Sequence, residues 1–177
     1  MKERLIKVII GVFAVLPFIA ASCMMNDKDD IPDFGEQLQK DLAAIDEYLA
    51  AKGIDAEQDP DGFIRYVIHH DSIGDNKPTL DSCVTANYQG KLLANEQEFD
   101  KGINVSFPIY GVIDGWKIGI PLLSLGDSAT LYIPSGLGYG YYGFDPDIPS
   151  NANLIFHVGV KNVGETYKAS STGDSCD

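Results

Sequence analysis

The sequence predicts an α+β domain with several antiparallel strands, one short embedded helix, and a longer amphipathic helix ahead of them. One stretch, Phe34–Lys52, places its apolar residues at helical spacing, whereas later stretches repeat with a period of two. A short apolar segment around Trp116 interrupts the strands and is entered through a glycine. The length of 177 residues, 45% of them hydrophobic, suits one globular domain. Together these observations favour the α+β class.

The first predicted helix spans about Phe34–Lys52. Asp33 has the position of an N-cap, and Glu36 follows three residues later, where a reciprocal carboxylate is expected. Gly53 is free to adopt the left-handed conformation that ends many helices. The helix either docks on the domain or mediates association. We favour docking, because one face of the helix is apolar at Leu38, Leu42, Ile45 and Leu49.

Alternating stretches farther along the chain predict the strands, and the last of them is the clearest. In it Leu154 and Phe156 face one way, while Ile155 and His157 face the other. From Gly164 onward the chain is small and polar, and we expect a frayed tail. A turn at Asp59–Gly62 precedes the first strand, and the short helix is predicted at Ile113–Ser124. The predicted strands are Phe63–Ile68, Ser82–Leu93, Ser106–Tyr110, Ala129–Ile133 and Asn153–Val163.

Several classes of function are disfavoured by composition and spacing. A formal net charge of −13 repels phosphate backbones, so we expect no nucleic-acid partner. A calcium loop from Glu57 fails because its twelfth position is Ile68. Gly138–Gly143 has the glycine spacing of a dinucleotide loop, but the proline-rich residues after it cannot start a helix. His69 and His70 are adjacent on a strand and point to opposite faces, so we expect neither metal nor cofactor.

The chain has three cysteines, too few for a disulfide scaffold. Cys83 lies in a predicted strand and Cys176 in the predicted tail, so a bond between them after export is left open. No serine or cysteine stands in a recognisable nucleophile motif with one of the histidines.

The first residues have the features of a bacterial lipoprotein signal peptide. Basic residues precede the apolar run Val8–Ala21, which is shorter than the roughly 20 residues of a spanning helix. The run ends in small residues before Cys23, which resembles the site where the cysteine becomes the lipidated first residue. An ordinary signal peptide with Cys23 incidental is the alternative. The cluster Asn26–Asp30 resembles the surface-export signal of some Bacteroidetes lipoproteins, and a solvated spacer explains it equally well.

Four later segments follow one another in a distinctive order: Cys83–Gly90, Glu98–Asp100, Phe107–Trp116 and Leu131–Phe156. The third contains Val-Ile-Asp-Gly-Trp, and the fourth contains Ile-Pro, Leu-Gly-Tyr-Gly, a second Ile-Pro and Leu-Ile-Phe. In this order and spacing they resemble the FKBP-type peptidyl-prolyl cis-trans isomerase family, across roughly Phe63–Val163. With its N-terminal motif, the chain is similar to lipoprotein members of that family from Bacteroidetes.

The resemblance implies an antiparallel sheet of five or six strands wrapped around one short helix, with a shallow aromatic cleft between them. Carried over to this chain, Trp116 is the floor of the cleft and Ile148 lies at its rim. Tyr139 offers its hydroxyl to a substrate carbonyl, the backbone N–H of Ile113 is a second donor, and Asp100 sits beside Tyr139. Without the resemblance the apolar residues would be interpreted as core. The implied walls are Tyr88, Phe99, Val112, Ile113 and Phe156.

The implied activity is rotation about X–Pro peptide bonds, which breaks no covalent bond and so needs neither nucleophile nor metal. The barrier is about 18–20 kcal/mol because the amide loses resonance, and a dry aromatic cleft favours the twisted amide. Between Asp100 and Phe107 the chain is shorter than in many relatives and has no arginine. Val105 replaces a frequent aromatic residue, and Phe144 stands where polar residues are common. We expect these departures to affect substrate preference and macrolide affinity more than the fold.

We therefore predict a peptidyl-prolyl cis-trans isomerase that acts on proline-containing polypeptides folding outside the cytoplasm. We expect a monomer, exported and lipid-anchored to the cell envelope through Cys23 on a periplasmic or surface face, with macrolides as candidate ligands. One alternative is a proline-binding chaperone or adaptor without turnover. Another is a surface lipoprotein that binds a glycan or a partner protein through its acidic face or N-terminal helix. The expected segments are a signal peptide (1–22), a polar tether (23–32), an amphipathic helix (33–53), an isomerase domain (62–164) and a flexible tail (165–177).

Overall fold

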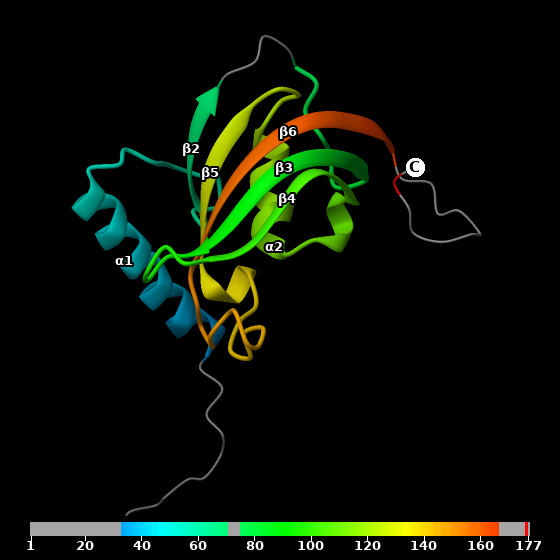
Figure 1. Ribbon diagram of the computed structural model, residues 1–177. Helices are drawn as coiled ribbons and strands as arrows, with labels where there is room; N and C mark the ends of the chain where they lie inside the picture. The colour runs from blue at the N-terminus through cyan, green and yellow to red at the C-terminus, as the bar shows by residue number, and fades with distance from the viewer. Residues whose placement is uncertain (1–32, 71–74, 167–175, 177) are drawn as a thin grey trace, which may run out of the picture. The chain divides into compact units, whose positions relative to one another are not determined.

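Figure 1 shows the computed structural model of the chain, which describes residues 33–70, 75–166 and 176. The predicted signal peptide (1–22) and tether (23–32) lie outside the described residues, as do residues 167–175 and 177 of the predicted tail. In the part that the structure describes, no helix is long and apolar enough to cross a membrane.

Six antiparallel strands form one sheet in the order β1-β2-β5-β6-β3-β4. The sheet curves around the short helix α2 (Asp114–Gly119) on one side, and the long helix α1 (Phe34–Lys52) lies on the other (Figure 1). This arrangement confirms the predicted fold class. The strands are β1 (Glu57–Gln58), β2 (Arg65–His70), β3 (Ser82–Leu92), β4 (Glu98–Pro108), β5 (Ser128–Ile133) and β6 (Leu154–Thr166).

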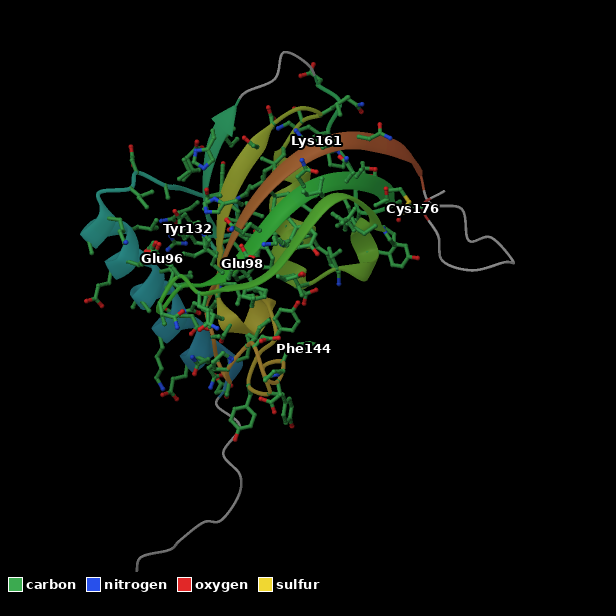
Figure 2. The ribbon with its side chains drawn as sticks, viewed as in Figure 1. Glu96, Glu98, Tyr132, Phe144, Lys161 and Cys176 are labelled. Atoms are coloured by element: carbon green, nitrogen blue, oxygen red, sulfur yellow. A yellow bond between two sulfur atoms is a disulfide. The ribbon has the colours of Figure 1, made fainter. Side chains whose placement is uncertain are left out.

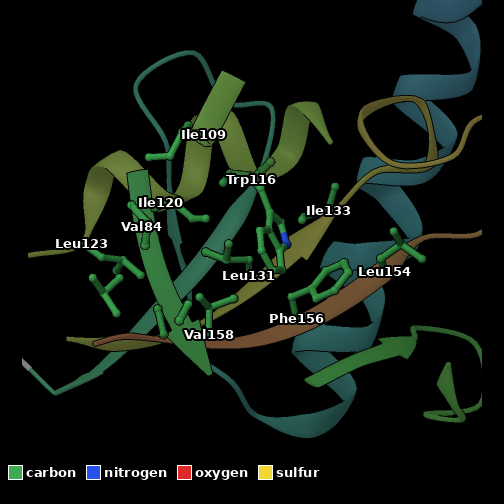
Figure 3. Packing of buried hydrophobic residues seen from close by; sticks show 14 of the residues in the cluster. Val84, Ile109, Trp116, Ile120, Leu123, Leu131, Ile133, Leu154, Phe156 and Val158 are labelled. Atoms are coloured by element: carbon green, nitrogen blue, oxygen red, sulfur yellow. The ribbon is translucent and has the colours of Figure 1, made fainter. Parts of the chain in front are cut away.

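The inner face of the sheet, which carries Leu131 and Phe156, packs on α2 and contains the main core (Figure 3). Helix α2 approaches this face closely because two of its residues are glycines. A Cβ atom on Gly115 would collide with the side chain of Ile133, and one on Gly119 would lie 2.6 Å from Leu131. The short helix therefore fits inside the curved sheet only because these two positions lack side chains.

Helix α1 begins and ends where the local signals predict. The Asp33 carboxylate accepts hydrogen bonds from the backbone N–H groups of Gly35 and Glu36, at 3.1 and 3.3 Å. Gly53 follows the last turn with a φ of 65°, a left-handed conformation that suits glycine. The reciprocal half of the predicted cap differs, because the Glu36 carboxylate lies 2.7 Å from Nζ of Lys40 in the next turn.

Helix α1 docks on the outer face of the sheet, the side opposite α2, as predicted. Ion pairs fix its C-terminal half: Asp46 lies 2.9 Å from Nε of Arg65, and Nζ of Lys52 lies 2.6 Å from the Glu96 carboxylate. In Figure 2, Glu96 and Tyr132 lie beside this helix. The buried apolar residues at the contact, some from α1 and some from the outer face, are Ile45, Leu49, Leu93, Tyr132 and Ile155.

Strand β2 begins at Arg65, later than the predicted start at Phe63. The Asp59 carboxylate is buried and accepts a hydrogen bond from the backbone N–H of Ile64 at 2.6 Å. This bond extends the turn through Ile64. Pairing of β2 with the neighbouring strand β5 therefore begins only at Arg65. A local side-chain acceptor therefore overrides the apolar alternation of the sequence.

Strand β4 runs from Glu98 to Pro108, far longer than the predicted Ser106–Tyr110. It is an edge strand, and most of its side chains are exposed, so its residues show little alternation of polarity. Main-chain pairing with β3 along its length holds it in the sheet. A pattern read from side chains alone misses a strand of this kind.

Strand β6 extends to Thr166, beyond Gly164, where the sequence predicts a frayed tail. A disulfide joins Cys83 to Cys176, with the two Cα atoms 5.6 Å apart. The bond that the sequence leaves open is therefore present. Val84 points into the core and successive strand residues face opposite ways, so the Cys83 side chain lies on the outer face.

Candidate functional site

A cavity of about 320 Å³ opens between α2, the β3–β4 hairpin and the loop that follows β5. Its lining is mainly aromatic and aliphatic. The polar side-chain groups in the lining are two tyrosine hydroxyls, one carboxylate and one indole N–H. The lining residues are Tyr88, Asp100, Val105, Phe107, Gly111, Val112, Ile113, Trp116, Tyr139 and Phe156.

Trp116, on α2, lies at the centre of this lining and is 5% exposed. Its ring lies next to that of Phe156 in Figure 3. It meets Phe156 edge-on with centroids 5.1 Å apart, and Tyr88 edge-on at 5.2 Å. Phe107 lies 5.1 Å away on another side. These contacts fix the indole orientation. Its buried Nε1 has no hydrogen-bond partner among the described residues.

Tyr88 and Asp100 form the polar wall of the cavity, on the paired strands β3 and β4. The Tyr88 hydroxyl donates a hydrogen bond to Oδ2 of Asp100 at 2.9 Å, and the backbone N–H of Lys101 donates to Oδ1 at 2.8 Å. Tyr88 stands opposite Gly102 in the ladder. A Cβ atom on Gly102 would lie 2.5 Å from the Tyr88 ring, so the ring lies flat across this strand only because the residue is glycine.

Both cavity tyrosines keep their protons more tightly than a free tyrosine. Burial, followed by the hydrogen bond to Asp100 and its negative charge, raises the pKa of Tyr88 to about 12. Burial and then the charge of Asp100 raise the pKa of Tyr139. At neutral pH both phenols are therefore protonated and act as hydrogen-bond donors.

Tyr139 is presented by the loop between β5 and β6, which starts with the 3-10 turn η3 (Ser135–Leu137). Gly143 in this loop has a φ of 64°, and its Cα lies so near the Ile148 carbonyl that no Cβ fits. Two backbone hydrogen bonds, of 2.7 and 2.8 Å, pair Phe144 with Ile148 and close the loop. The Phe144 ring lies 5.8 Å from the Tyr139 ring and is 61% exposed (Figure 2).

The structure gathers all but two of the predicted site residues around the cavity. Ile148 is not at the rim: it is 3% exposed and belongs to the main core, because its pairing with Phe144 turns it inward. Phe99 does not line the cavity but packs edge-on against Phe156, with ring centroids 5.5 Å apart. The Asp100 side chain accepts a hydrogen bond from the Tyr88 hydroxyl, and it shares the cavity lining with Tyr139, on whose pKa its charge acts.

Phe107 and Gly111 line the cavity although the sequence analysis assigned them no role, and Val105 was noted only as a wall position. Val105 and Phe107 are two residues apart on β4, so they share one face of the strand. Recognition of the full length of β4 would have identified both.

The described residues contain no group of three or more His, Cys, Asp or Glu side chains arranged to hold a metal ion. What the cavity offers is a mainly apolar, aromatic surface edged by a few hydrogen-bond donors. Such a surface binds a compact apolar ring and orients the polar backbone next to it.

Sequence comparisons place the chain among known proteins. A family model described as FKBP-type peptidyl-prolyl cis-trans isomerase matches residues 74–161. FK506-binding protein 1 of Eremothecium gossypii is 42% identical over 100 residues, covering 52% of this chain and 87% of that relative. A probable FKBP-type isomerase FkpA of Neisseria meningitidis is 42% identical over 97 residues. That match covers 52% of this chain but only 35% of the Neisseria protein.

Solved structures agree with this placement. A peptidyl-prolyl cis-trans isomerase from Pseudomonas syringae shares the fold, with a TM-score of 0.63, 24% identity, and coverage of 76% of this chain and 98% of its own. FkpA from Escherichia coli has a TM-score of 0.61 and 29% identity, with coverage of 73% and 62%. The described cavity, the fold and the sequence matches lead to one assignment. This chain belongs to the FKBP-type peptidyl-prolyl cis-trans isomerase family.

Proposed function

We propose that this protein accelerates cis-trans rotation about X–Pro bonds by binding the twisted amide in the cavity over Trp116. The observation that supports this most directly is the composition of that cavity in a member of this family. Its floor is an indole and its walls are aromatic. A pyrrolidine ring is a compact apolar group of the kind such a surface accepts.

The cavity favours rotation through differential binding. A planar amide is strongly polar because its nitrogen lone pair is delocalised, and twisting localises that pair and reduces the charge separation. A dry aromatic surface therefore binds the twisted form better than the planar form, which lowers the barrier. No bond is made or broken, so the task of the residues is to bind and orient the segment.

The proposed donors are the Tyr139 hydroxyl and the backbone N–H of Ile113, which hold the carbonyls that flank the rotating bond. Tyr139 lines the cavity, and its phenol is protonated at neutral pH, so it can donate a hydrogen bond there. Asp100 does not contact the amide in this proposal. Through its 2.9 Å hydrogen bond it holds the Tyr88 ring in place as a wall.

The rim of the cavity supports a preference for an apolar residue before the proline. Val105 lines the cavity and is 37% exposed, and Phe144, which is 61% exposed, packs against the ring of the lining residue Tyr139. An apolar side chain at that substrate position would cover them. Macrolides are candidate ligands, because relatives of this chain are named FK506-binding proteins.

We further propose that the clients are exported polypeptides and that the protein is a monomer anchored to the envelope through lipid on Cys23. The disulfide between Cys83 and Cys176 supports export, since such bonds persist mainly outside the reducing cytosol. Mass spectrometry of the mature N-terminus tests the anchor: acyl groups on Cys23 are expected, with loss of membrane association in Cys23→Ser. An unmodified cysteine would contradict the anchor while leaving the isomerase proposal intact.

The isomerase proposal is tested by following cis-to-trans relaxation of Leu-Pro and Phe-Pro peptides by NMR exchange with the full-length protein. Acceleration is expected to fall at least about tenfold in Trp116→Leu, because the apolar floor is reduced. In Tyr139→Phe the acceleration is expected to fall by a similar factor, because the hydroxyl donor is lost. Tyr142→Phe is the matched control, since Tyr142 is 78% exposed in the same loop and does not line the cavity.

Two outcomes would contradict the proposal. Peptide binding without acceleration would identify a proline-binding module instead of a catalyst. An equal loss of acceleration in Tyr139→Phe and Tyr142→Phe would show that the loop matters only as a structural unit. The Tyr139 hydroxyl would then have no role in rotation.

A further inference from the structure

We propose that Asp41, on helix α1, is a positioning residue for the hydroxyl of Tyr139. Helix α1 lies on the outer face of the sheet, whereas the cavity lies on the inner side. In this inference, which rests on the isomerase function proposed above, α1 acts on the cavity through one buried carboxylate. Asp41 binds Ser135, and Ser135 binds the loop that carries Tyr139.

Asp41 is unusual in its place on α1. It is 3% exposed and lies among the apolar residues that dock the helix. Its Oδ2 accepts hydrogen bonds from the backbone N–H of Ser135 at 2.9 Å and from the Ser135 hydroxyl at 2.6 Å. Its Oδ1 accepts a bond from the Gln37 side-chain amide at 2.8 Å. All three partners are neutral donors.

Docking alone does not call for a carboxylate at this position. A buried carboxylate has to be compensated by hydrogen bonds, and an apolar residue would continue the stripe formed by Leu38, Ile45 and Leu49. What the carboxylate adds is direction, because its two bonds to Ser135 hold one residue of the loop at a fixed place. Ser135 is completely buried.

Ser135 in turn holds the loop on both sides of Tyr139. The Ser135 carbonyl accepts hydrogen bonds from the backbone N–H of Gly138 at 2.9 Å and of Gly140 at 2.8 Å. Tyr139 stands between these two glycines. A displacement of Ser135 therefore shifts the backbone on both sides of the tyrosine and moves its hydroxyl relative to the floor of the cavity.

A second contact ties Ser135 to the sheet as well as to the helix. Asn153, just before β6, accepts a bond from the Ser135 backbone N–H at 3.0 Å, and its amide donates to the Asp41 carbonyl at 3.5 Å. Phe34 also lies over η3, since a Cβ atom on Gly136 would be 2.7 Å from its ring. The N-terminal half of α1 therefore contacts η3 at several points, and Asp41 supplies the directional bonds.

The test compares two aspartates on the same helix in the full-length protein. Asp41→Ala removes the link to Ser135, and Asp46→Ala removes the ion pair with Arg65, which also anchors α1 but contacts neither η3 nor Tyr139. We expect kcat/KM for a Leu-Pro peptide to fall about tenfold in Asp41→Ala. Little change is expected in Asp46→Ala. Asp41→Asn keeps an acceptor oxygen for Ser135 and is expected to stay within about twofold of the unmodified protein.

A double-mutant cycle separates positioning from general loss of structure. If Asp41 acts through Tyr139, Asp41→Ala has little further effect in the Tyr139→Phe background, because the hydroxyl it positions is already gone. An equal loss in both backgrounds would overturn the inference. So would an equal loss in Asp41→Ala and Asp46→Ala.

Hydrogen exchange gives a readout that does not depend on activity. The amides of Gly138 and Gly140 are expected to exchange at least about tenfold faster in Asp41→Ala than in Asp46→Ala, because their acceptor is no longer held. If the unmodified protein does not accelerate isomerisation, the proposed function is refuted. The hydrogen-exchange comparison then still tests whether Asp41 holds the loop of Tyr139 through Ser135. Unchanged exchange at both glycines would refute the link itself.

Discussion

The two faces of the sheet are built on different principles. The inner face meets α2 through apolar and aromatic contacts, and among the described residues that line the cavity Asp100 alone has a charged side chain. The outer face meets α1 through apolar contacts supplemented by buried polar groups, Asp41 and Arg65. Apolar contacts are non-directional, whereas hydrogen bonds and ion pairs fix position and orientation. The inner face is thus suited to accept a ligand, and the outer face to hold a helix in one register.

The part of the outer face beyond α1 is polar and hydrogen-bonded within itself. Thr130 is buried, and its hydroxyl lies 2.6 Å from Nε2 of His69 and 2.8 Å from Nδ1 of His157. Burial, then the positive charge of Lys91 and the neighbouring His69, lowers the pKa of His157. The contrast with the cavity is clear: on the outer face a buried polar group has protein partners, whereas the indole N–H of Trp116 has none among the described residues.

The largest expected effect tests whether the two faces form one cooperative unit. Ile45 on α1 and Leu131 on β5 are both completely buried, so Ile45→Ala and Leu131→Ala should each lower the free energy of unfolding by about 2–5 kcal/mol. Urea unfolding followed by tryptophan fluorescence and by circular dichroism should give one coincident transition for each variant. A separate early transition in Ile45→Ala alone would show that α1 unfolds independently.

The disulfide sharpens the comparison, because it lies on the outer face away from the cavity. Cys176→Ser should lower the free energy of unfolding by about 2–4 kcal/mol, since the bond closes a sequence separation of 93 residues and restricts the unfolded chain. Isomerisation measured at low temperature, where the variant stays folded, should be unchanged. The control is the unmodified protein with its disulfide reduced. A loss of isomerisation in both this control and Cys176→Ser would show that the disulfide also affects the cavity on the inner face.

A smaller effect is expected for two tyrosine–carboxylate pairs on the inner side of the sheet, one in the cavity and one at the far edge. Tyr88→Phe removes the bond to Asp100 in the cavity and should cost about 1–2 kcal/mol, as for a hydrogen bond to a charged acceptor. Tyr66→Phe removes a bond of 3.1 Å to Glu57 at the edge of the sheet and should cost less than half as much, because burial raises the pKa of Tyr88 further than that of Tyr66. Thermal unfolding measures both. The reverse order would mean that solvent screens the cavity pair more than the pair at the sheet edge.

The smallest effect is a pH dependence at the alkaline end. The pKa of Tyr88 is raised from 10.0 to about 12, mainly by burial, so its neutral form is favoured by folding. The resulting stability is fully present below pH 10 and is lost as the pH rises toward 12. The difference in absorbance at 295 nm between the unmodified protein and Tyr88→Phe should titrate near pH 12. A difference that titrates near pH 10 would contradict the raised pKa of Tyr88.

Prediction from the sequence was best where the determinants are local. The bounds of α1 follow from Asp33 and Gly53, whose effects act within a few residues. Strand β4 was largely missed because its exposed edge leaves no pattern of polarity. Most cavity residues were placed by resemblance, yet Ile148 was misplaced because its pairing with Phe144 turns it into the core.

The role of Asp41 shows what no local pattern contains. In the sequence it interrupts an apolar stripe, and its partner Ser135 is 94 residues away. Nothing within a helical turn of either residue indicates that they meet. A carboxylate at an apolar position was the available signal, since such a group must find a distant donor once it is buried.

The sequence by itself determined the helix and its ends, the β character of most of the chain, and a set of residues suited to a dry aromatic cleft. The helix, its ends and the β character follow from side-chain spacing and backbone preference, which act over short distances. The cleft residues follow from the resemblance to the family. Only the tertiary structure decided that Tyr88 donates a hydrogen bond to Asp100 and that Asp41 on α1 binds Ser135 in the loop that carries Tyr139. The same is true of the disulfide between Cys83 and Cys176. Tyr88 and Asp100 meet because β3 pairs with β4, whereas Asp41 and Ser135 are 94 residues apart in the sequence and the two cysteines are 93 residues apart.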